Sequence, residues 1–267
     1  MKKLQILIIV LFILSGAKGQ NCLPGGIKFS TQAQIDNFQN NYPGCTHIEG
    51  EVIITGTDIS KLDGLSALRS IGESLLIYEN YSLKSLAGLD NLSHIGKGLY
   101  IEYTSLDSLA GLDNLVFIGG ELKIHFNQSL SSLKGLDKVD SIGGDIMVSV
   151  NNSLASLEGL EGLHSVKGDL TIRNNDSLVS LVALKRLHAI GGYLQVSHNH
   201  SLASLAGLDN INAGSVTDVI IMGNSSLSTC KVKSLCDLLA SPDSNIEIHE
   251  NAAGCNSQVE VKAGCDR

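Results

Sequence analysis

The sequence predicts an all-β fold, a right-handed β-solenoid related to leucine-rich repeats, with short helical caps at both ends. Three observations predict this fold class. A leucine-rich unit of about 24 residues recurs from Val52 to Asn251. Each copy contains a Leu-x-Ile pattern with the period of a strand, and each carries two further apolar stretches. A fixed period of this kind is typical of stacked repeats that bury one face against their neighbours.

Residues 1–19 have the features of a secretory signal peptide. Two lysines precede an apolar run from Ile6 to Leu14, and Ala17 and Gly19 suit cleavage near Gly19. The run is too short to span a bilayer. We therefore expect an exported mature chain without a membrane span, secreted, at the cell surface or in a periplasm.

The charge of the chain excludes some classes of partner. Lysine and arginine number 19 against 27 aspartates and glutamates, for a formal net charge of −8. An acidic exported protein without a basic run is a poor nucleic-acid binder, so we expect no nucleic-acid partner. The repeat predicts one domain over 20–267, with an N-terminal cap (22–50), repeats (51–227) and a disulfide-linked C-terminal cap (228–267).

Six cysteines in an exported chain indicate disulfides. Cys22 and Cys45 lie near one end, and a bridge between them is the favoured pairing. The other four allow three pairings that the sequence does not separate: Cys230, Cys236, Cys255 and Cys265. Their spacing does not suit a zinc site, so we expect no metal and no cofactor.

The first apolar stretch of each turn predicts a strand. Leu75 and Ile77 alternate with Leu76 and Tyr78, and we expect Leu75 and Ile77 to point inward. Stacked parallel copies would lie about 4.8 Å apart. The equivalent pairs are Val52-x-Ile54, Leu99-x-Ile101, Leu122-x-Ile124, Ile146-x-Val148, Leu170-x-Ile172, Leu194-x-Val196, Val219-x-Ile221 and Ile246-x-Ile248.

Two further apolar stretches complete each turn. One comprises Leu83, Leu86 and Leu89, and the other ends in Ile71-Gly72, where glycine permits tight or left-handed backbone. Three apolar stretches and three bends predict a roughly triangular cross-section. Short helical turns on one side would instead give a leucine-rich-repeat horseshoe, which the Leu-Ala-Gly-Leu segments leave open.

One column of the repeat holds asparagines, which we expect to bond the backbone groups of a buried bend and one another. Thr57 and Thr104 fill gaps in this column. Several of these asparagines also match Asn-x-Ser, but the column itself generates the match, and modifying an inward asparagine would break the turn. Its members are Asn80, Asn127, Asn151, Asn175, Asn199, Asn224 and Asn251.

Both ends predict short helices. Thr31 and Gln34 form a plausible capping box before a helix through Ile35 and Phe38. Near the other end, Val232, Leu235, Cys236 and Leu239 have helical spacing that stops near Pro242.

Two motifs resemble a known family. Cys45 is followed by Thr46-x-Ile48-x-Gly50 and a first strand at Val52, and Ile118-Gly119-Gly120-x-Leu122-x-Ile124 recurs in later turns. Both are similar to the receptor L domain, the leucine-rich β-solenoid of the insulin and epidermal growth factor receptor ectodomains. The resemblance covers roughly Cys22 to Cys265. The regular turns are closer to exported L-domain-like proteins of bacteria, especially Bacteroidetes. The resemblance implies extracellular recognition and fixes no ligand.

The outward positions of the predicted strands give a candidate binding site. Aromatic residues gather in three adjacent turns, and exposed aromatic clusters on a rigid sheet suit protein or sugar recognition. The alternative is that strands simply favour tyrosine. We predict a site for an extracellular protein or carbohydrate at Tyr78, Tyr100, Glu102, Tyr103, Lys123, His125 and Phe126, with Tyr81 nearby.

Other functions find less support in the sequence. Glu79, Glu102, Lys123 and His125 form the one patch suited to polysaccharide hydrolysis or elimination, but no catalytic motif accompanies it, and we expect no enzyme. A structural envelope or matrix protein is a third class. His198-Asn199-His200, with His249 two turns away, suggests a metal site, but a pair of turn-exposed histidines is the simpler interpretation.

Overall fold

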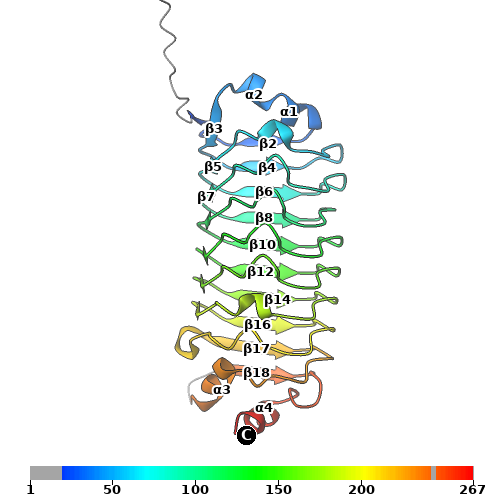
Figure 1. Ribbon diagram of the computed structural model, residues 1–267, viewed down its shortest axis with the longest axis vertical. Helices are drawn as coiled ribbons and strands as arrows, with labels where there is room; N and C mark the ends of the chain where they lie inside the picture. The colour runs from blue at the N-terminus through cyan, green and yellow to red at the C-terminus, as the bar shows by residue number, and fades with distance from the viewer. Residues whose placement is uncertain (1–19, 242–244, 267) are drawn as a thin grey trace, which may run out of the picture.

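Parallel strands stack along the long axis of the molecule, with helices at both ends (Figure 1). The computed structural model describes residues 20–241 and 245–266. The predicted signal peptide and Pro242 lie outside the described residues. Among the described residues, no helix is both long enough and apolar enough to cross a membrane.

One face of the stack is a sheet of ten described strands, here called the long-strand sheet. Equivalent residues of neighbouring turns pair directly, as Leu75 with Leu99 and Leu99 with Leu122. Its strands are β2 (Ile27–Phe29), β4 (Val52–Ile54), β6 (Leu75–Tyr78), β8 (Leu99–Glu102), β10 (Leu122–His125), β12 (Ile146–Ser149), β14 (Leu170–Arg173), β16 (Leu194–Ser197), β17 (Asp218–Met222) and β18 (Asn245–His249).

A second parallel sheet covers another face and is here called the short-strand sheet. Most of its strands contain only two residues, because each turn is extended over a short segment there. Its strands are β1 (Gln20–Cys22), β3 (Cys45–Ile48), β5 (Ser70–Ile71), β7 (His94–Ile95), β9 (Phe117–Ile118), β11 (Ser141–Ile142), β13 (Ser165–Val166) and β15 (Ala189–Ile190).

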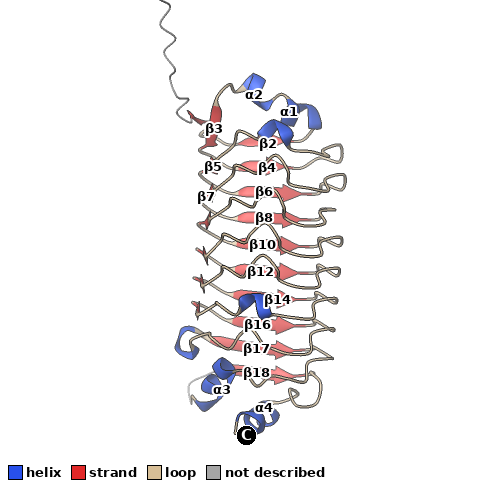
Figure 2. Ribbon diagram, in the orientation of Figure 1, coloured by secondary structure: helices blue, strands red, loops and turns tan. Residues whose placement is uncertain are grey.

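The third side consists mainly of turns (Figure 2). Short 3₁₀ segments occur at η1 (Asp63–Leu65), η2 (Val182–Leu184) and η3 (Ala213–Ser215). This side packs its leucines inward, and Leu83, Leu86 and Leu89 are fully buried. The β-solenoid with three sides is therefore confirmed, and the horseshoe is not the fold.

The predicted inward columns form one continuous core. Leu75, Ile77 and their counterparts in the next turns are essentially inaccessible to solvent. The outward residues of the same strands are half-buried, because side chains of adjacent turns cover one another. Burial of the inward columns is the main stabilising contribution that the repeat provides.

A buried asparagine ladder closes the corner after most strands of the long-strand sheet. The Asn151 Nδ2 atom donates to the Ile124 carbonyl of the previous turn (3.0 Å) and to Asn175 Oδ1 of the next (3.2 Å). Its Oδ1 accepts from the Asn127 backbone amide at 3.0 Å. This pattern confirms the predicted role of the column, and Thr104 takes part by bonding Asn127.

The prediction for Thr57 was wrong. Thr57 is exposed, and the Gly56 amide instead donates to Asn80 Oδ1 at 3.1 Å. The first corner places Gly56 two residues after Ile54, whereas Asn80 follows Ile77 by three, so this corner is one residue shorter. Glycine supplies only its amide at this position.

The glycines of the Ile-Gly corners are needed for close approach between turns. A Cβ atom on Gly96 would lie 2.0 Å from the Gly72 carbonyl oxygen. Left-handed backbone occurs elsewhere, at glycines such as Gly88 and Gly111 in the Ala-Gly-Leu segments. Of the two alternatives for the Ile-Gly corners, tight packing is the one observed.

Helices and disulfides cover both ends of the stack. The capping box of Thr31 and Gln34 is confirmed, although the chain forms two helices, α1 (Gln32–Asp36) and α2 (Phe38–Asn41), in place of one. At the other end lie α3 (Lys233–Ala240), as predicted, and α4 (Gln258–Cys265), which was not predicted. Disulfides join Cys22 to Cys45, Cys230 to Cys255 and Cys236 to Cys265.

Candidate functional site

The outward face of the long-strand sheet places the predicted site residues in two columns. Tyr78, Glu102 and His125 are direct neighbours in register across β6, β8 and β10. Tyr100 and Lys123 are neighbours in the second column. Three consecutive turns therefore supply this surface, here called the aromatic face, and its side chains are half-buried or exposed.

The exposed rings of the aromatic face lie at the corner that follows the strands. Tyr103 and Phe126 stack with centroids 4.9 Å apart and planes 19° apart. The His125 ring meets both edge-on, with centroid separations of 5.9 and 5.1 Å. About two fifths of Tyr103 and of Phe126 is exposed, so an apolar ridge is presented to solvent.

The backbone at this ridge has a left-handed conformation. Tyr103 has a φ of 53°, Phe126 59° and Val150 58°. For a residue with a side chain, this conformation costs about 1–2 kcal/mol, and bulky or β-branched residues are unusual there. Asn174 occupies the equivalent position one turn later and suits the conformation better. The three bulky residues therefore adopt a backbone conformation that their side chains disfavour.

Charged groups on the aromatic face are largely paired with one another. Lys123 Nζ lies 3.0 Å from Glu102 Oε1, and both side chains are mostly buried. His125 Nδ1 lies 2.7 Å from Ser149 Oγ. Burial lowers the pKa of His125, although the nearby Glu102 carboxylate partly opposes the effect.

Glu121 belongs to this face and was missed from the sequence. It immediately precedes β10, and its carboxyl is hydrogen-bonded to Tyr100. Burial raises the pKa of Glu121, whereas the Tyr100 hydrogen bond and the charge of Lys123 lower it. Burial also raises the pKa of Tyr100, and so does the Glu121 carboxylate. A residue just outside the Leu-x-Ile pattern carries no sequence signal for this contact.

Arg173 extends the same face further along the stack. It follows Ser149 in register, and its Nε atom is buried without a hydrogen-bond partner among the described residues. An unpartnered buried donor is uncommon in folded proteins. The repeat pattern places Arg173 in the outward column but predicts no role for it.

Three aromatic residues of the predicted cluster, Tyr78, Tyr81 and Tyr100, make no ring contact among the described residues. Tyr81 follows the ladder residue Asn80, so it lies beyond the corner, and 56% of it is exposed. Within the described ranges, Tyr78 makes no ring contact, although it shares the register of Glu102 and His125. The ring-to-ring contacts of the site are therefore confined to Tyr103, His125 and Phe126.

The carboxylates of this face are poorly arranged for hydrolysis. Glu102 is bound to Lys123, and Glu121 is bound to Tyr100. Glu79 is exposed on the left-handed corner. A general acid and base need free carboxyls facing a common substrate position, and this pairing does not provide them.

The histidines considered for metal binding remain dispersed. The rings of His198 and His200 are 6.4 Å apart and nearly perpendicular. His200 approaches Asp176 at 4.0 Å, and His249 approaches Glu250 at 3.5 Å. In the part of the chain that the structure describes, no three such side chains form a group that could hold a metal ion.

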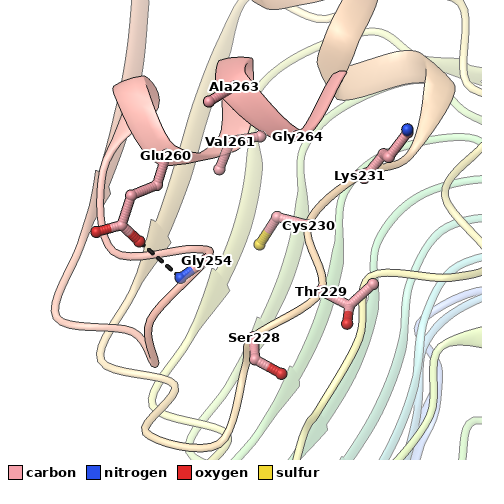
Figure 3. Close-up of a pocket in the computed structure, with 9 residues that line it drawn as sticks. All are labelled: Ser228, Thr229, Cys230, Lys231, Gly254, Glu260, Val261, Ala263 and Gly264. Carbon is pink, nitrogen blue, oxygen red and sulfur yellow. Dashed lines mark hydrogen bonds between the residues drawn. The ribbon is translucent and has the colours of Figure 1, made fainter. Parts of the chain in front are cut away.

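A cavity of about 360 Å³ lies at the C-terminal cap, between α4 and the preceding turn. Figure 3 shows the Glu260 carboxylate directed toward the Gly254 amide, and a hydrogen bond of 2.7 Å joins them. Glu260 also accepts from the Asn256 amide. The buried Cys230 is disulfide-bonded to Cys255. These groups stabilise the cap, and the Glu260 carboxylate is already hydrogen-bonded to two backbone amides.

The fold is a β-solenoid whose long-strand sheet carries aromatic and charged residues on its outward face. Residues 44–106 match the model of the receptor L domain family. This segment runs from β3 through β8 and contains Tyr78, Tyr100, Glu102 and Tyr103. No curated protein matches the chain. The match supports the resemblance seen in the sequence and indicates an extracellular ligand-binding domain. It does not distinguish bacterial from animal members.

Proposed function

We propose that the protein is a non-catalytic extracellular recognition module that binds a protein or glycan through the aromatic face. The exposed stack of Tyr103 and Phe126 carries the proposal. Exposed aromatic rings on a rigid scaffold contribute large contact areas at low entropic cost, and such residues dominate many binding interfaces. The family match supports a ligand-binding role for the adjoining turns.

The left-handed corner adds support from the backbone. Stability alone would favour glycine or asparagine at these positions, as at Gly223 and Asn174. Bulky rings at Tyr103 and Phe126 cost backbone energy and expose apolar area, neither of which helps folding. The same corner is left-handed at Glu79, Val150 and His198, so the conformation belongs to the repeat, and the exposed rings are what distinguish these two turns.

Polar groups around the ridge would give specificity. The Glu102–Lys123 pair and the half-buried Arg173 lie on the same face. Arg173 adds a positive charge to this face. An apolar centre with a polar margin is the usual composition of a recognition surface.

The test replaces Tyr103 and Phe126 with asparagine, a residue that suits the left-handed backbone of this corner. The purified chain is screened against an array of neutral glycans and a displayed random-peptide library, and the strongest binder is measured on Tyr103→Asn/Phe126→Asn. We expect at least a tenfold loss of affinity, since central aromatic residues commonly contribute about 2 kcal/mol or more. Stability should stay within about 1 kcal/mol of wild type, because relief of strain offsets the lost stacking.

Tyr81→Asn is the matched control. It removes an exposed aromatic ring one corner away and should leave the affinity unchanged. Equal binding by the double variant and the wild type would contradict the proposal, as would the absence of any binder in both screens. Shortened sugars released from the array would support the enzymatic alternative.

A further inference from the structure

A hollow of about 570 Å³ lies on the outer face of the short-strand sheet, away from the aromatic face. Among the described residues that line it, His47, Arg69 and His94 are basic and none is acidic. They come from three consecutive turns of a chain whose formal net charge is −8. The positive charge of Arg69, two ring nitrogens that can donate hydrogen bonds and the lack of a lining carboxylate suit an anionic ligand.

The register of the strands explains the shape of this hollow. His47, Ser70, His94 and Phe117 are successive neighbours across β3, β5, β7 and β9. Adjacent strands are about 4.8 Å apart, so His47 and His94 are separated by roughly twice that distance. Ser70 lies between them and is too small to fill the space. Two imidazoles therefore flank a gap that Arg69 adjoins.

Hydroxyl groups fix both imidazole rings. Thr46 Oγ1 lies 2.7 Å from His47 Nδ1, and Ser93 Oγ lies 2.8 Å from His94 Nδ1. Within residues 20–241 and 245–266, the Nε2 atom of each ring has no hydrogen-bond partner. Oriented rings with a free nitrogen lose little entropy when they bind a ligand.

Arg69 adds a guanidinium group that is available to a ligand. In the described part of the chain, its side chain forms no ion pair, whereas Lys97 pairs with Glu73 on the adjoining corner. A guanidinium presents a planar set of donors that suits the oxygens of a sulfate or carboxylate.

Phe117 gives the hollow an apolar end. Its side chain is 45% exposed, and its ring lies 6.1 Å from that of His94. A ligand that suits this combination carries an anionic group on a body with an apolar face and hydroxyls. Sugar rings have these properties, and Ser70 and Ser93 offer hydroxyls to them.

We propose that this hollow, with Arg69, His47 and His94 around Ser70 and Phe117 at its end, binds an anionic sugar unit, a sulfated or carboxylated hexose. The site is separate from the aromatic face and does not depend on the proposed function.

The test uses sulfated, carboxylated and neutral oligosaccharides of equal length, titrated calorimetrically into the chain. We expect binding of a sulfated or a carboxylated probe, and the comparison between them identifies the anionic group. Arg69→Gln/His94→Gln should weaken binding at least tenfold, because two charge-assisted hydrogen bonds are removed. Phe117→Ser should weaken it several-fold.

A second pair, in the segments that precede β13 and β15 of the same sheet, is the matched control. His164→Gln/Arg186→Gln removes the same residue types and the same charge, but there Arg186 Nη2 is already bonded to His164 Nε2 at 2.8 Å. This variant should bind within twofold of wild type, as should Tyr103→Asn/Phe126→Asn. Equal losses in both Arg/His variants would show a non-specific charge effect and overturn the site. No binding of either anionic probe, equal binding of the neutral one, or tighter binding of a phosphopeptide would also overturn it.

Discussion

Asn151 shows what one side chain contributes to every turn of the stack. Its oxygen satisfies the Asn127 amide, and its nitrogen satisfies the Ile124 carbonyl and the next asparagine. All these groups are buried, so water cannot replace the lost partners. The sequence was enough to predict this role, because a polar residue that recurs among inward leucines is tolerated only if its side chain is hydrogen-bonded.

Asn151→Ala should lower the free energy of unfolding by about 3 kcal/mol, since it leaves at least two buried backbone groups without a hydrogen-bond partner. Urea denaturation monitored by circular dichroism measures the change. Asn152→Ala is the control, because Asn152 is exposed, and it should stay within about 0.5 kcal/mol of wild type. A similar small effect for Asn151→Ala would contradict the structural role of the ladder.

The sequence could not predict the conformation of the residue before each ladder asparagine. Tyr103, Phe126 and Val150 are poor candidates for left-handed backbone, and only the stacking of turns imposes it. For the same reason the sequence placed Tyr81 with the other rings, although the corner separates them. The inward columns were predictable because burial repeats with the period, whereas corner geometry depends on the number of residues between columns.

Neighbouring strands determine the chemistry of the aromatic face. Glu121, just before β10, meets Tyr100 of β8, and Lys123 of β10 meets Glu102 of β8. Parallel register pairs Lys123 with Tyr100 and His125 with Glu102, so both contacts are diagonal and reach across columns. The repeat therefore placed these residues on one face but did not predict either contact. Helix α4 was also missed, although Ser257 and Glu260 supply an N-terminal capping pattern.

The raised pKa of Glu121 predicts a pH dependence of stability. The folded state holds this proton more tightly than the unfolded chain, whose reference pKa is 4.5. The stabilisation is thus complete below about pH 4.5 and is lost as pH rises through the folded pKa. Glu121→Gln should therefore be modestly more stable than wild type at pH 7, and the difference should disappear near pH 4.

Urea denaturation between pH 4 and 8 measures this dependence. Tyr100→Phe removes the hydrogen bond that lowers the pKa of Glu121, so its stability should also begin to fall near pH 4.5 but should continue to fall to a higher pH than that of the wild type. Lower stability of the Gln variant at pH 7 would show that the Glu121 carboxylate is stabilising and would contradict the prediction.

The whole molecule is a line of units, each in contact mainly with its two neighbours. Register is preserved across β12, β14 and β16, with Ile146 paired to Leu170 and Leu170 to Leu194. Stability in such a stack is close to a sum of unit and interface contributions. The ends differ, because helices and disulfides cover the exposed strands there.

Deletion of residues 150–173 removes one complete turn and should leave a folded protein. The deletion joins Ser149 to Asn174, which already has the left-handed conformation of that corner, and allows β12 to pair with β16 in register. We expect one cooperative transition and a loss of about 2 kcal/mol, in proportion to the residues removed.

Circular dichroism and urea denaturation distinguish this outcome from that of a shorter deletion. Removal of residues 150–161, half a turn, would delete the ladder residue Asn151 and the buried Leu154 and Leu157, leave β12 without a corner, and should abolish cooperative unfolding. If the full-turn deletion also failed to fold, the independence of the units would be disproved.

The asparagine ladder also affects the order of events during biosynthesis. Six of its members lie in Asn-x-Ser triplets: Asn80, Asn127, Asn151, Asn175, Asn199 and Asn224. In the finished stack these side chains are hidden from an oligosaccharyltransferase, but in a nascent chain they are not. In a host that glycosylates during translocation, closure of each turn would compete with attachment of a glycan that the turn has no room to hold. The ladder that stabilises the folded protein therefore makes the unfolded chain vulnerable in such a host.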